Sequence, residues 1–157
     1  REVRLVRFDT RRKRPSSTAF TGKLKALNRF SDAFPWLLLS QASLDDLNQR
    51  LSLPVPIDRF RPNIVIADVP AYAEDRIDEI STGEVRMRLV KPCTRCAITT
   101  VDQESGVRAG DEPLRTLRTY RFDRRLRGVV FGQNAILVSG AGKILRVGQP
   151  IAMAWKS

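Results

Sequence analysis

Hydrophobic and polar residues alternate along several short stretches of the chain, which is the pattern of β-strands with one buried face. The clearest stretch is 84–90, where Val85, Met87 and Leu89 alternate with charged residues. The β-branched run at 64–67 predicts a fully buried strand. Further short strands are predicted at 3–8, 37–40, 96–100, 129–131, 135–138, 143–147 and 151–155.

Helical periodicity is confined to two stretches. The leucines at positions 44, 47 and 51 fall on one helical face, and Ser40 or Ser43 can cap the first turn. Pro113 suits the first position of a second helix. Residues 9–30 show little periodicity and are predicted to form a long loop. About eight to ten short strands with two helices is the spacing expected of a β-barrel with helical insertions.

Composition narrows the class of protein and the kind of partner. The length of 157 residues fits one domain with a substantial core. The net charge of +11 calls for an anionic partner. Nucleic acid is not favoured, because the basic residues are spread along the chain without a recognition motif. A phosphate-bearing cofactor or an acidic protein would use the same charge, and a solvated basic face is a further alternative.

Targeting signals and cysteine content bear on location. No apolar run reaches transmembrane length and no signal peptide is visible. Two cysteines do not make a disulfide framework, so we expect a reducing, cytoplasmic setting, without membrane attachment. We also expect a bacterial source. The abrupt start at Arg1, without an initiator methionine, predicts a fragment of a longer protein.

Both cysteines lie in the stretch Lys91-Pro-Cys-Thr-Arg-Cys96. A structural zinc site needs four nitrogen or sulfur ligands, and the chain has no histidine and no third cysteine. A thioredoxin-type pair should open a helix, whereas the flanks here predict strands. In an extended chain Cys93 and Cys96 point to opposite faces, with their Cα atoms roughly 10 Å apart, too far for a disulfide. Only one of the two thiols can therefore address a given site.

Two other polar clusters are candidates for chemistry. Arg59, Arg61 and Asn63 precede a buried strand and could form a phosphate or oxyanion site, or be surface arginines with a turn asparagine. Glu74 and Asp75 could be an acid–base pair, although adjacent carboxylates are more often a solvated turn or partners of nearby arginines.

Several longer motifs follow one another in a specific order from about Phe30 onward. They are Phe34-Pro35, Leu39-Ser-Gln-Ala-Ser-Leu-Asp-Asp-Leu-Asn48, Arg59-Phe-Arg-Pro-Asn-Ile-Val-Ile66, Tyr72-Ala-Glu-Asp75, Lys91-Pro-Cys-Thr-Arg-Cys-Ala-Ile-Thr-Thr-Val-Asp102, Glu112-Pro-Leu-x-Thr-Leu117, Phe131-Gly-Gln-Asn134 and Val147-Gly148. Together they resemble a MOSC domain, named after the C-terminal domain of molybdenum cofactor sulfurases. The branch they resemble includes the amidoxime-reducing components and bacterial reductases of N-hydroxylated compounds.

The resemblance implies a mainly β fold, a MOSC-type β-barrel of short, mostly antiparallel strands with two or three helices. It also implies a molybdenum–pyranopterin cofactor whose metal is held by one protein thiolate, that of Cys96, which makes Cys96 the catalytic and metal-binding residue. A thiolate is a suitable soft ligand for such a metal. Cys93 would then have a supporting role. The implied cofactor-binding residues are Ala33, Phe34, Arg61, Asn63, Thr94, Arg95, Cys96 and Asn134.

The resemblance further implies an oxidoreductase that removes oxygen from small N-hydroxylated substrates. Its electrons would come from a separate donor, a ferredoxin-type iron–sulfur protein or a b-type cytochrome with a flavin reductase. Residues 1–157 would be a single MOSC domain without the N-terminal β-rich domain or C-terminal ferredoxin domain of some relatives. The alternative is a sulfur-carrier module of the sulfurase type, whose relatives carry a desulfurase domain that binds pyridoxal phosphate.

Overall fold

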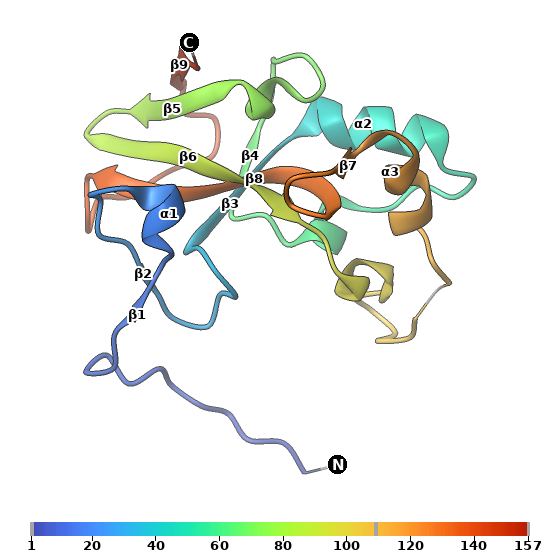
Figure 1. Ribbon diagram of the computed structural model, residues 1–157, viewed down its shortest axis with the longest axis horizontal. Helices are drawn as coiled ribbons and strands as arrows, with labels where there is room; N and C mark the ends of the chain where they lie inside the picture. Colours follow the sequence, from blue (N-terminus) through green and yellow to red (C-terminus); the bar gives the residue numbers. More distant parts are fainter. Residues whose placement is uncertain (1, 109, 157) are drawn as a thin grey trace.

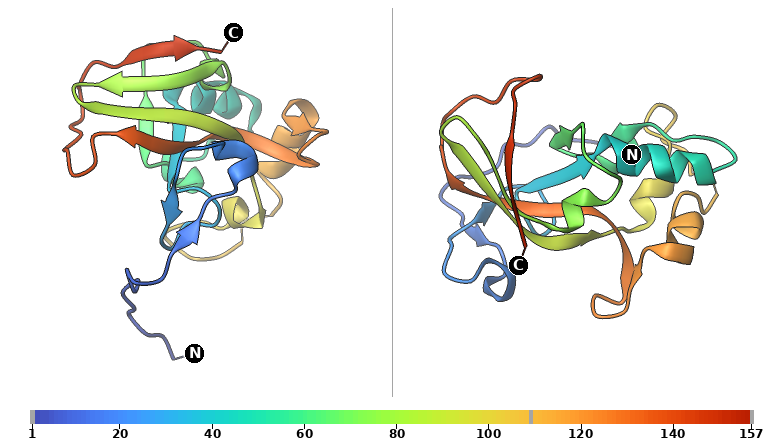
Figure 2. Two further views of the ribbon diagram at one scale, coloured as in Figure 1. Left: turned by 60° about the vertical axis from the view of Figure 1, so that its left-hand side comes forward. Right: turned by 90° about the horizontal axis from the view of Figure 1, so that it is seen from above.

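The computed structural model describes residues 2–108 and 110–156, and their central element is one curled sheet. Its strands follow the order β4-β3-β8-β6-β5-β9, with β7 paired to β8 alone. All pairs are antiparallel except β3 with β4, and the sheet bends into a half-barrel (Figures 1 and 2). The strands are β3 (Trp36–Ser40), β4 (Ile64–Ile66), β5 (Ile77–Thr82), β6 (Val85–Thr94), β7 (Phe122–Asp123), β8 (Gly128–Ser139) and β9 (Ala152–Trp155). The predicted mainly β, mostly antiparallel fold is confirmed.

One hydrophobic core fills the inside of the curled sheet. The alternating residues Val85, Met87 and Leu89 of β6 all point into it and are buried. Side chains in a strand alternate between its two faces, so this pattern alone determines which face of β6 is covered. Ile77 and Ile80 of β5 complete the same cluster.

A second core lies between the sheet and the helices α2 (Gln41–Arg50) and α3 (Leu114–Tyr120). Phe60, from the 3₁₀-helix η1 (Ile57–Phe60), packs on Phe131 of β8 with ring centroids 4.5 Å apart. The predicted cap of the first helix is confirmed, since the Ser40 hydroxyl accepts a hydrogen bond from the Ser43 amide at 3.1 Å.

Ser43 also connects α2 to the buried carboxyl group of Glu74. Its hydroxyl is 2.8 Å and 3.0 Å from the two Glu74 oxygens, and it accepts the Tyr72 amide at 2.7 Å. Glu74 lies in the 3₁₀-helix η2 (Ala73–Asp75) and is 1% exposed. This hydroxyl thereby fixes the η2 loop on the start of α2.

Replacing Ser43 with alanine should lower the free energy of unfolding by about 2 kcal/mol, because buried polar groups of Glu74 and Tyr72 then lose a partner. Urea denaturation followed by circular dichroism measures the change. The exposed Ser52→Ala is the matched control and should change stability by less than about 0.5 kcal/mol. Equal effects of the two changes would contradict the proposed link.

The N-terminal part differs from the prediction. The predicted loop at 9–30 contains a two-residue pair of strands, β1 (Arg14–Pro15) with β2 (Leu27–Asn28), and the short helix α1 (Thr18–Thr21) between them. The predicted strand at 3–8 is wrong: these residues lie outside the strands of the described part of the chain, and Leu5 is fully exposed. An alternating pattern forms a strand only where a neighbouring strand offers hydrogen bonds.

The strand predicted at 96–100 is also wrong. A 3₁₀-helix, η3 (Ala97–Thr100), takes its place. The hydroxyl of Thr99 donates to the carbonyl of Cys96 at 3.0 Å, and that of Thr100 donates to the carbonyl of Ala97 at 2.8 Å. Such local side-chain bonds stabilise a turn against an extended strand.

Two further strand predictions need correction. The segments 129–131 and 135–138 form one continuous strand, β8, with Gly132 inside it at a φ of 77°. Residues 143–147 do not form a strand. Turns at 141–142 and 147–148 flank residues 143–146, and Gly140 and Gly142 have the positive φ angles with which the chain leaves β8. The last predicted strand is confirmed as β9.

Candidate functional site

The predicted site is centred on the end of β6, where the chain leaves the sheet and enters η3. Arg95 anchors this point to two neighbouring segments. Its backbone amide donates to the carbonyl of Val129 at 2.8 Å, and its Nη2 donates to the carbonyl of Phe60 at 2.8 Å. The guanidinium also lies 5.4 Å from the centroid of the Phe60 ring. Arg95 therefore holds η1 and the end of β6 together.

The two cysteines have different surroundings. Cys93 is half-buried and its sulfur accepts a hydrogen bond from Nη1 of Arg95 at 3.1 Å. Cys96 is exposed and caps η3, with its carbonyl bonded to the amide of Thr99 at 3.2 Å. Both thiols are free.

A second link holds the other end of the Cys96 segment. Arg59, in η1, is 7% exposed, and its Nη2 lies 2.9 Å from Oδ2 of Asp102. The segment 95–102 is thus attached to η1 at both ends, with Cys96 between the two anchors. Arg59 and Arg61 were both candidates for binding an anion. Arg59 is paired with the Asp102 carboxylate, whereas Arg61 is exposed. Arg61 adopts a left-handed backbone conformation (φ 55°) at the end of η1.

The Asp102 carboxylate is stabilised mainly by Ser105. The amide and the hydroxyl of Ser105 both donate to Oδ1 at 2.9 Å, and these bonds, aided by the nearby Arg59, lower the pKa of Asp102. A lowered pKa keeps the Arg59–Asp102 ion pair charged to lower pH. The ion pair contributes fully to stability at a pH above the ordinary carboxyl pKa. This contribution is lost as the pH falls through the lowered pKa of Asp102.

We expect Ser105→Ala to raise the pKa of Asp102 toward its ordinary value, because one of the two donors is removed. The ion pair would then be lost at a higher pH during acid titration. Carbon-13 NMR titration of the aspartate carboxyl signals measures the shift, and Asp9, whose pKa is lowered by its bonds to Arg11, is the internal reference. An unchanged Asp102 titration would show that the Ser105 hydroxyl does not act on it.

Asn63 and Asn134 lie in one row across the sheet. Asn63 forms two hydrogen bonds of 2.8 Å with the backbone of Leu37. Its side-chain oxygen accepts the Leu37 amide, and its backbone amide donates to the Leu37 carbonyl. Leu37 is the register partner of Asn134, and Asn134 is the partner of Lys91. The row therefore connects four neighbouring chain segments. The side-chain oxygen of Asn63 already accepts the Leu37 amide. The residue is exposed, and its side-chain nitrogen, Nδ2, is available to a ligand.

Ala33 and Phe34 lie just before β3. Ala33 is exposed, and its carbonyl accepts a bond from the Asn28 side chain at 2.9 Å. Phe34 is 5% exposed and packs edge-on against Phe20, whose ring is also 4.9 Å from the Lys91 ammonium. The buried Phe34 ring leaves only backbone atoms for contact with a ligand. Thr94 is exposed and is the last residue of β6.

Glu74 and Asp75 are not arranged as an acid–base pair. Glu74 is buried against Ser43. Asp75 accepts a bond from the Gln133 side chain at 2.7 Å and forms an ion pair with Arg121 at 2.7 Å. The interpretation of Asp75 as a partner of a nearby arginine is confirmed.

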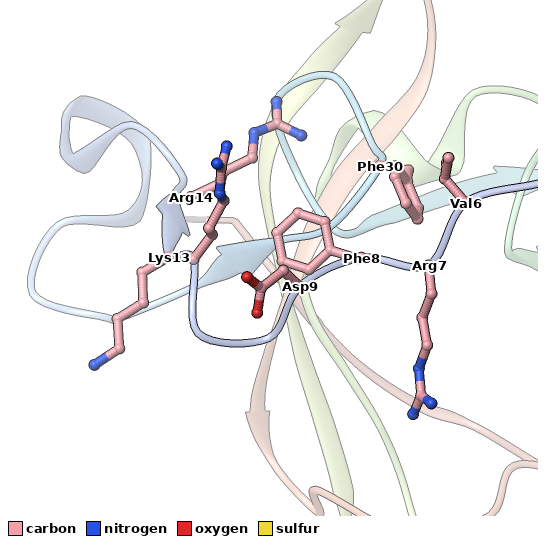
Figure 3. Close-up of a pocket in the computed structure, with 8 residues that line it drawn as sticks. Val6, Arg7, Phe8, Asp9, Lys13, Arg14 and Phe30 are labelled. Atoms are coloured by element: carbon pink, nitrogen blue, oxygen red, sulfur yellow. The ribbon is translucent and has the colours of Figure 1, made fainter.

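Two hollows of the structure lie away from Cys96. One, of about 710 Å³, is formed by the N-terminal segment, where the rings of Phe8 and Phe30 meet edge-on at 5.5 Å (Figure 3). Another, of about 730 Å³, lies between β4 and the segment 145–153. Neither is lined by Cys96. The predicted site is an exposed surface, and a ligand there would be bound along the ends of strands.

The described residues hold no group of three or more histidine, cysteine, aspartate or glutamate side chains that could bind a metal ion. They also contain no helix long and apolar enough to cross a membrane.

Comparison with known proteins gives three results. Residues 26–152 match the family model of the MOSC domain. The chain is 42% identical over 156 residues to the human protein named mitochondrial amidoxime-reducing component 1, covering 94% of this chain and 46% of that protein. It is 43% identical over 121 residues to the bovine mitochondrial amidoxime reducing component 2, covering 76% of this chain and 36% of the relative. The chain spans less than half the length of these relatives.

Among solved structures, the fold is similar to that of YiiM from Geobacillus stearothermophilus. The TM-score is 0.53 at 11% sequence identity, over 90% of this chain and 71% of that one. This likeness concerns the fold. The match of the family model over most of the chain decides the assignment, and the chain belongs to the MOSC domain family.

Proposed function

We propose that this chain is the molybdenum-cofactor-binding domain of an oxidoreductase that reduces N-hydroxylated compounds. The observation that carries the proposal is Cys96, an exposed thiol on a segment that η1 anchors at both ends. The names of the amidoxime-reducing relatives supply the reaction class. Residues 1–157 would be the MOSC domain of a longer protein, in line with the length of those relatives.

The residues fit an anionic, sulfur-rich group. Cys96 offers a soft ligand, and Arg61, at the end of η1, offers an exposed guanidinium. Arg59 and Arg95 each have a buried Nε without a partner among the described atoms, so donor capacity remains at the anchors. Asp102 is the one carboxylate of the anchored segment 95–102, and it is neutralised by Arg59.

When bound, the cofactor would supply the two-electron chemistry that removes oxygen from nitrogen. For an amidoxime the balance is two electrons and two protons taken up, with an amidine and water released. Cys96 would hold the metal in place, and Arg61 with the free amide of Asn63 would bind the anionic part of the cofactor. The anchors at Arg95 and Arg59 would keep the Cys96 sulfur in one position, which is what a metal ligand on a loop requires.

The test is to produce the full-length protein in a host that makes the cofactor. Molybdenum per chain is measured by mass spectrometry, and benzamidoxime reduction is followed with a chemical electron donor. We expect close to one molybdenum per chain and formation of benzamidine. A protein without molybdenum would refute the proposal. Bound molybdenum without reduction would instead support the sulfur-carrier alternative, in which the same cysteine takes part.

A further inference from the structure

A strongly basic stretch of the chain, residues 115–127, leads into the strand that pairs with the end of β6. Residues 115–127 contain six arginines and one acidic residue, a formal charge of +5. Arg115 and Arg121 form ion pairs. The other four are exposed and have no carboxylate within ion-pair distance among residues 2–108 and 110–156: Arg118, Arg124, Arg125 and Arg127.

Three of these arginines, Arg124, Arg125 and Arg127, occupy the turn between β7 and β8, which we call the basic hairpin. It projects from the body of the structure in the right-hand view of Figure 2. Free arginines on a projecting turn are not needed to hold the fold together. Charge placed in this way acts on another molecule.

The basic hairpin is joined directly to the chain that carries Cys96. Thr94 and Val130 are register partners, and the Arg95 amide donates to the carbonyl of Val129 at 2.8 Å. Gly128, the first residue of β8, approaches Thr94 so closely that a Cβ atom there would lie 3.4 Å from the Thr94 methyl group. The base of the basic hairpin therefore adjoins the end of β6, one or two residues before the exposed Cys96.

Apolar side chains lie exposed near the same arginines. Phe122 of β7 is 46% exposed, and Ile98 of η3 is 48% exposed. The centre of a protein interface is rich in arginine and aromatic residues, with polar groups around them. The combination of Phe122 with three free arginines fits a protein surface that is acidic and partly apolar.

We infer that the basic hairpin docks an acidic electron-donor protein, such as a small iron–sulfur or haem protein, close to Cys96. This inference rests on the proposed function, which requires two electrons for each substrate reduced. A one-electron donor would supply them in two successive encounters and leave each time in its oxidised form. Opposite charges would speed both encounters, and the rate would fall as salt is added.

A nucleic acid is the less suitable partner for this surface. Binding to the phosphate backbone needs basic residues along a groove or stripe, with aromatic rings arranged for stacking. The basic hairpin is a single projecting turn with one exposed ring, Phe122. Its position beside Cys96 also serves electron transfer and has no use in binding nucleic acid.

The experiment compares two variants of the full-length protein that carry the same change in charge. Arg124→Glu/Arg125→Glu alters the basic hairpin. Arg12→Glu/Lys13→Glu alters an exposed basic cluster in the N-terminal segment, away from the hairpin (Figure 1). The probe is a plant-type 2Fe–2S ferredoxin of strongly negative net charge. Its Kd is measured by calorimetry at low and high salt, and benzamidoxime reduction is driven either by this ferredoxin or by a chemical donor.

We expect the hairpin variant to weaken ferredoxin binding about tenfold or more at low salt and to lower the ferredoxin-driven kcat/KM to the same extent. Its rate with the chemical donor should stay within about twofold of the wild type. Equal losses in both variants would attribute the effect to net charge, and no loss in the hairpin variant would refute the docking surface. Salt-dependent binding of a DNA duplex that the hairpin variant alone loses, with ferredoxin binding unchanged, would assign the surface to nucleic acid instead.

The binding measurement does not require the reaction. If the wild type reduces nothing with the chemical donor, the proposed function fails, while the Kd values still decide whether the basic hairpin binds an acidic donor.

Discussion

Replacing Cys96 with alanine should reduce molybdenum in the full-length protein to background and lower benzamidoxime reduction more than a hundredfold. The described residues offer no cluster of other protein ligands that could replace the lost thiolate. Removing groups that merely orient a metal ligand already lowers affinity or activity about 10- to 100-fold, so losing the ligand itself should exceed that range. Metal analysis and the rate with a chemical donor measure the two effects.

Cys93→Ala is the matched control, because it removes a thiol three residues away on the same segment. The Cys93 sulfur accepts a bond from Arg95 and is half-buried, so its loss should mildly weaken the anchor and leave most of the metal bound. Thermal unfolding by circular dichroism checks that both variants fold. If the Cys96 variant kept its metal, or if the Cys93 variant lost as much, the assignment of the ligand would be wrong.

The sequence predicted the parts of the fold that depend on a single periodicity. The alternation in β6 and the leucine stripe of α2 each predict which face of the element is buried, because only one orientation of the element covers its apolar residues. The segments 3–8 and 143–147 show the limit of this reasoning. Their apolar residues, such as Leu5 and Val147, are exposed, because strand formation also needs a hydrogen-bonding neighbour that no local pattern reveals.

The motif around Cys96 proposes the residues of the candidate site, but it does not predict how they are held in place. The pairing of Arg59 with Asp102, for example, joins residues far apart in the sequence. The hydroxyls of Thr99 and Thr100 bend the chain after Cys96, where a strand pattern was read. A run of β-branched residues favours a strand only when its hydroxyls do not bond back to the preceding turn. The roles of Phe60 and Phe20 as supports under Arg95 and Lys91 had no signal in the sequence.

Gly132→Ala should be among the most destabilising single changes in the sheet, lowering the free energy of unfolding by about 2–5 kcal/mol. Gly132 lies inside β8, between β3 and β6, with a φ of 77°. A Cβ atom there would be 2.9 Å from the carbonyl oxygen of Leu38 and 3.3 Å from the side chain of Leu37. The left-handed conformation of a non-glycine residue costs about 1–2 kcal/mol, and crowding in a packed interior adds about 1–3 kcal/mol.

Gly83→Ala separates these two contributions. Gly83 also has a positive φ, 54°, but nothing lies within 4 Å of a Cβ atom built on it. Its replacement should therefore cost only the conformational part, about 1–2 kcal/mol. Urea denaturation of both variants measures the difference in their free energies of unfolding, and this difference is the cost of the clash with the backbone of β3.

The two changes should also differ in their effect on cofactor retention. Asn134 lies two residues after Gly132 in β8, so the clash at Gly132 should displace the row formed by Asn134, Leu37 and Asn63 and weaken retention. Gly83→Ala should leave retention intact. Equal destabilisation by the two changes would show that β3 and β8 can separate at this point without loss, contrary to the tight register of the half-barrel.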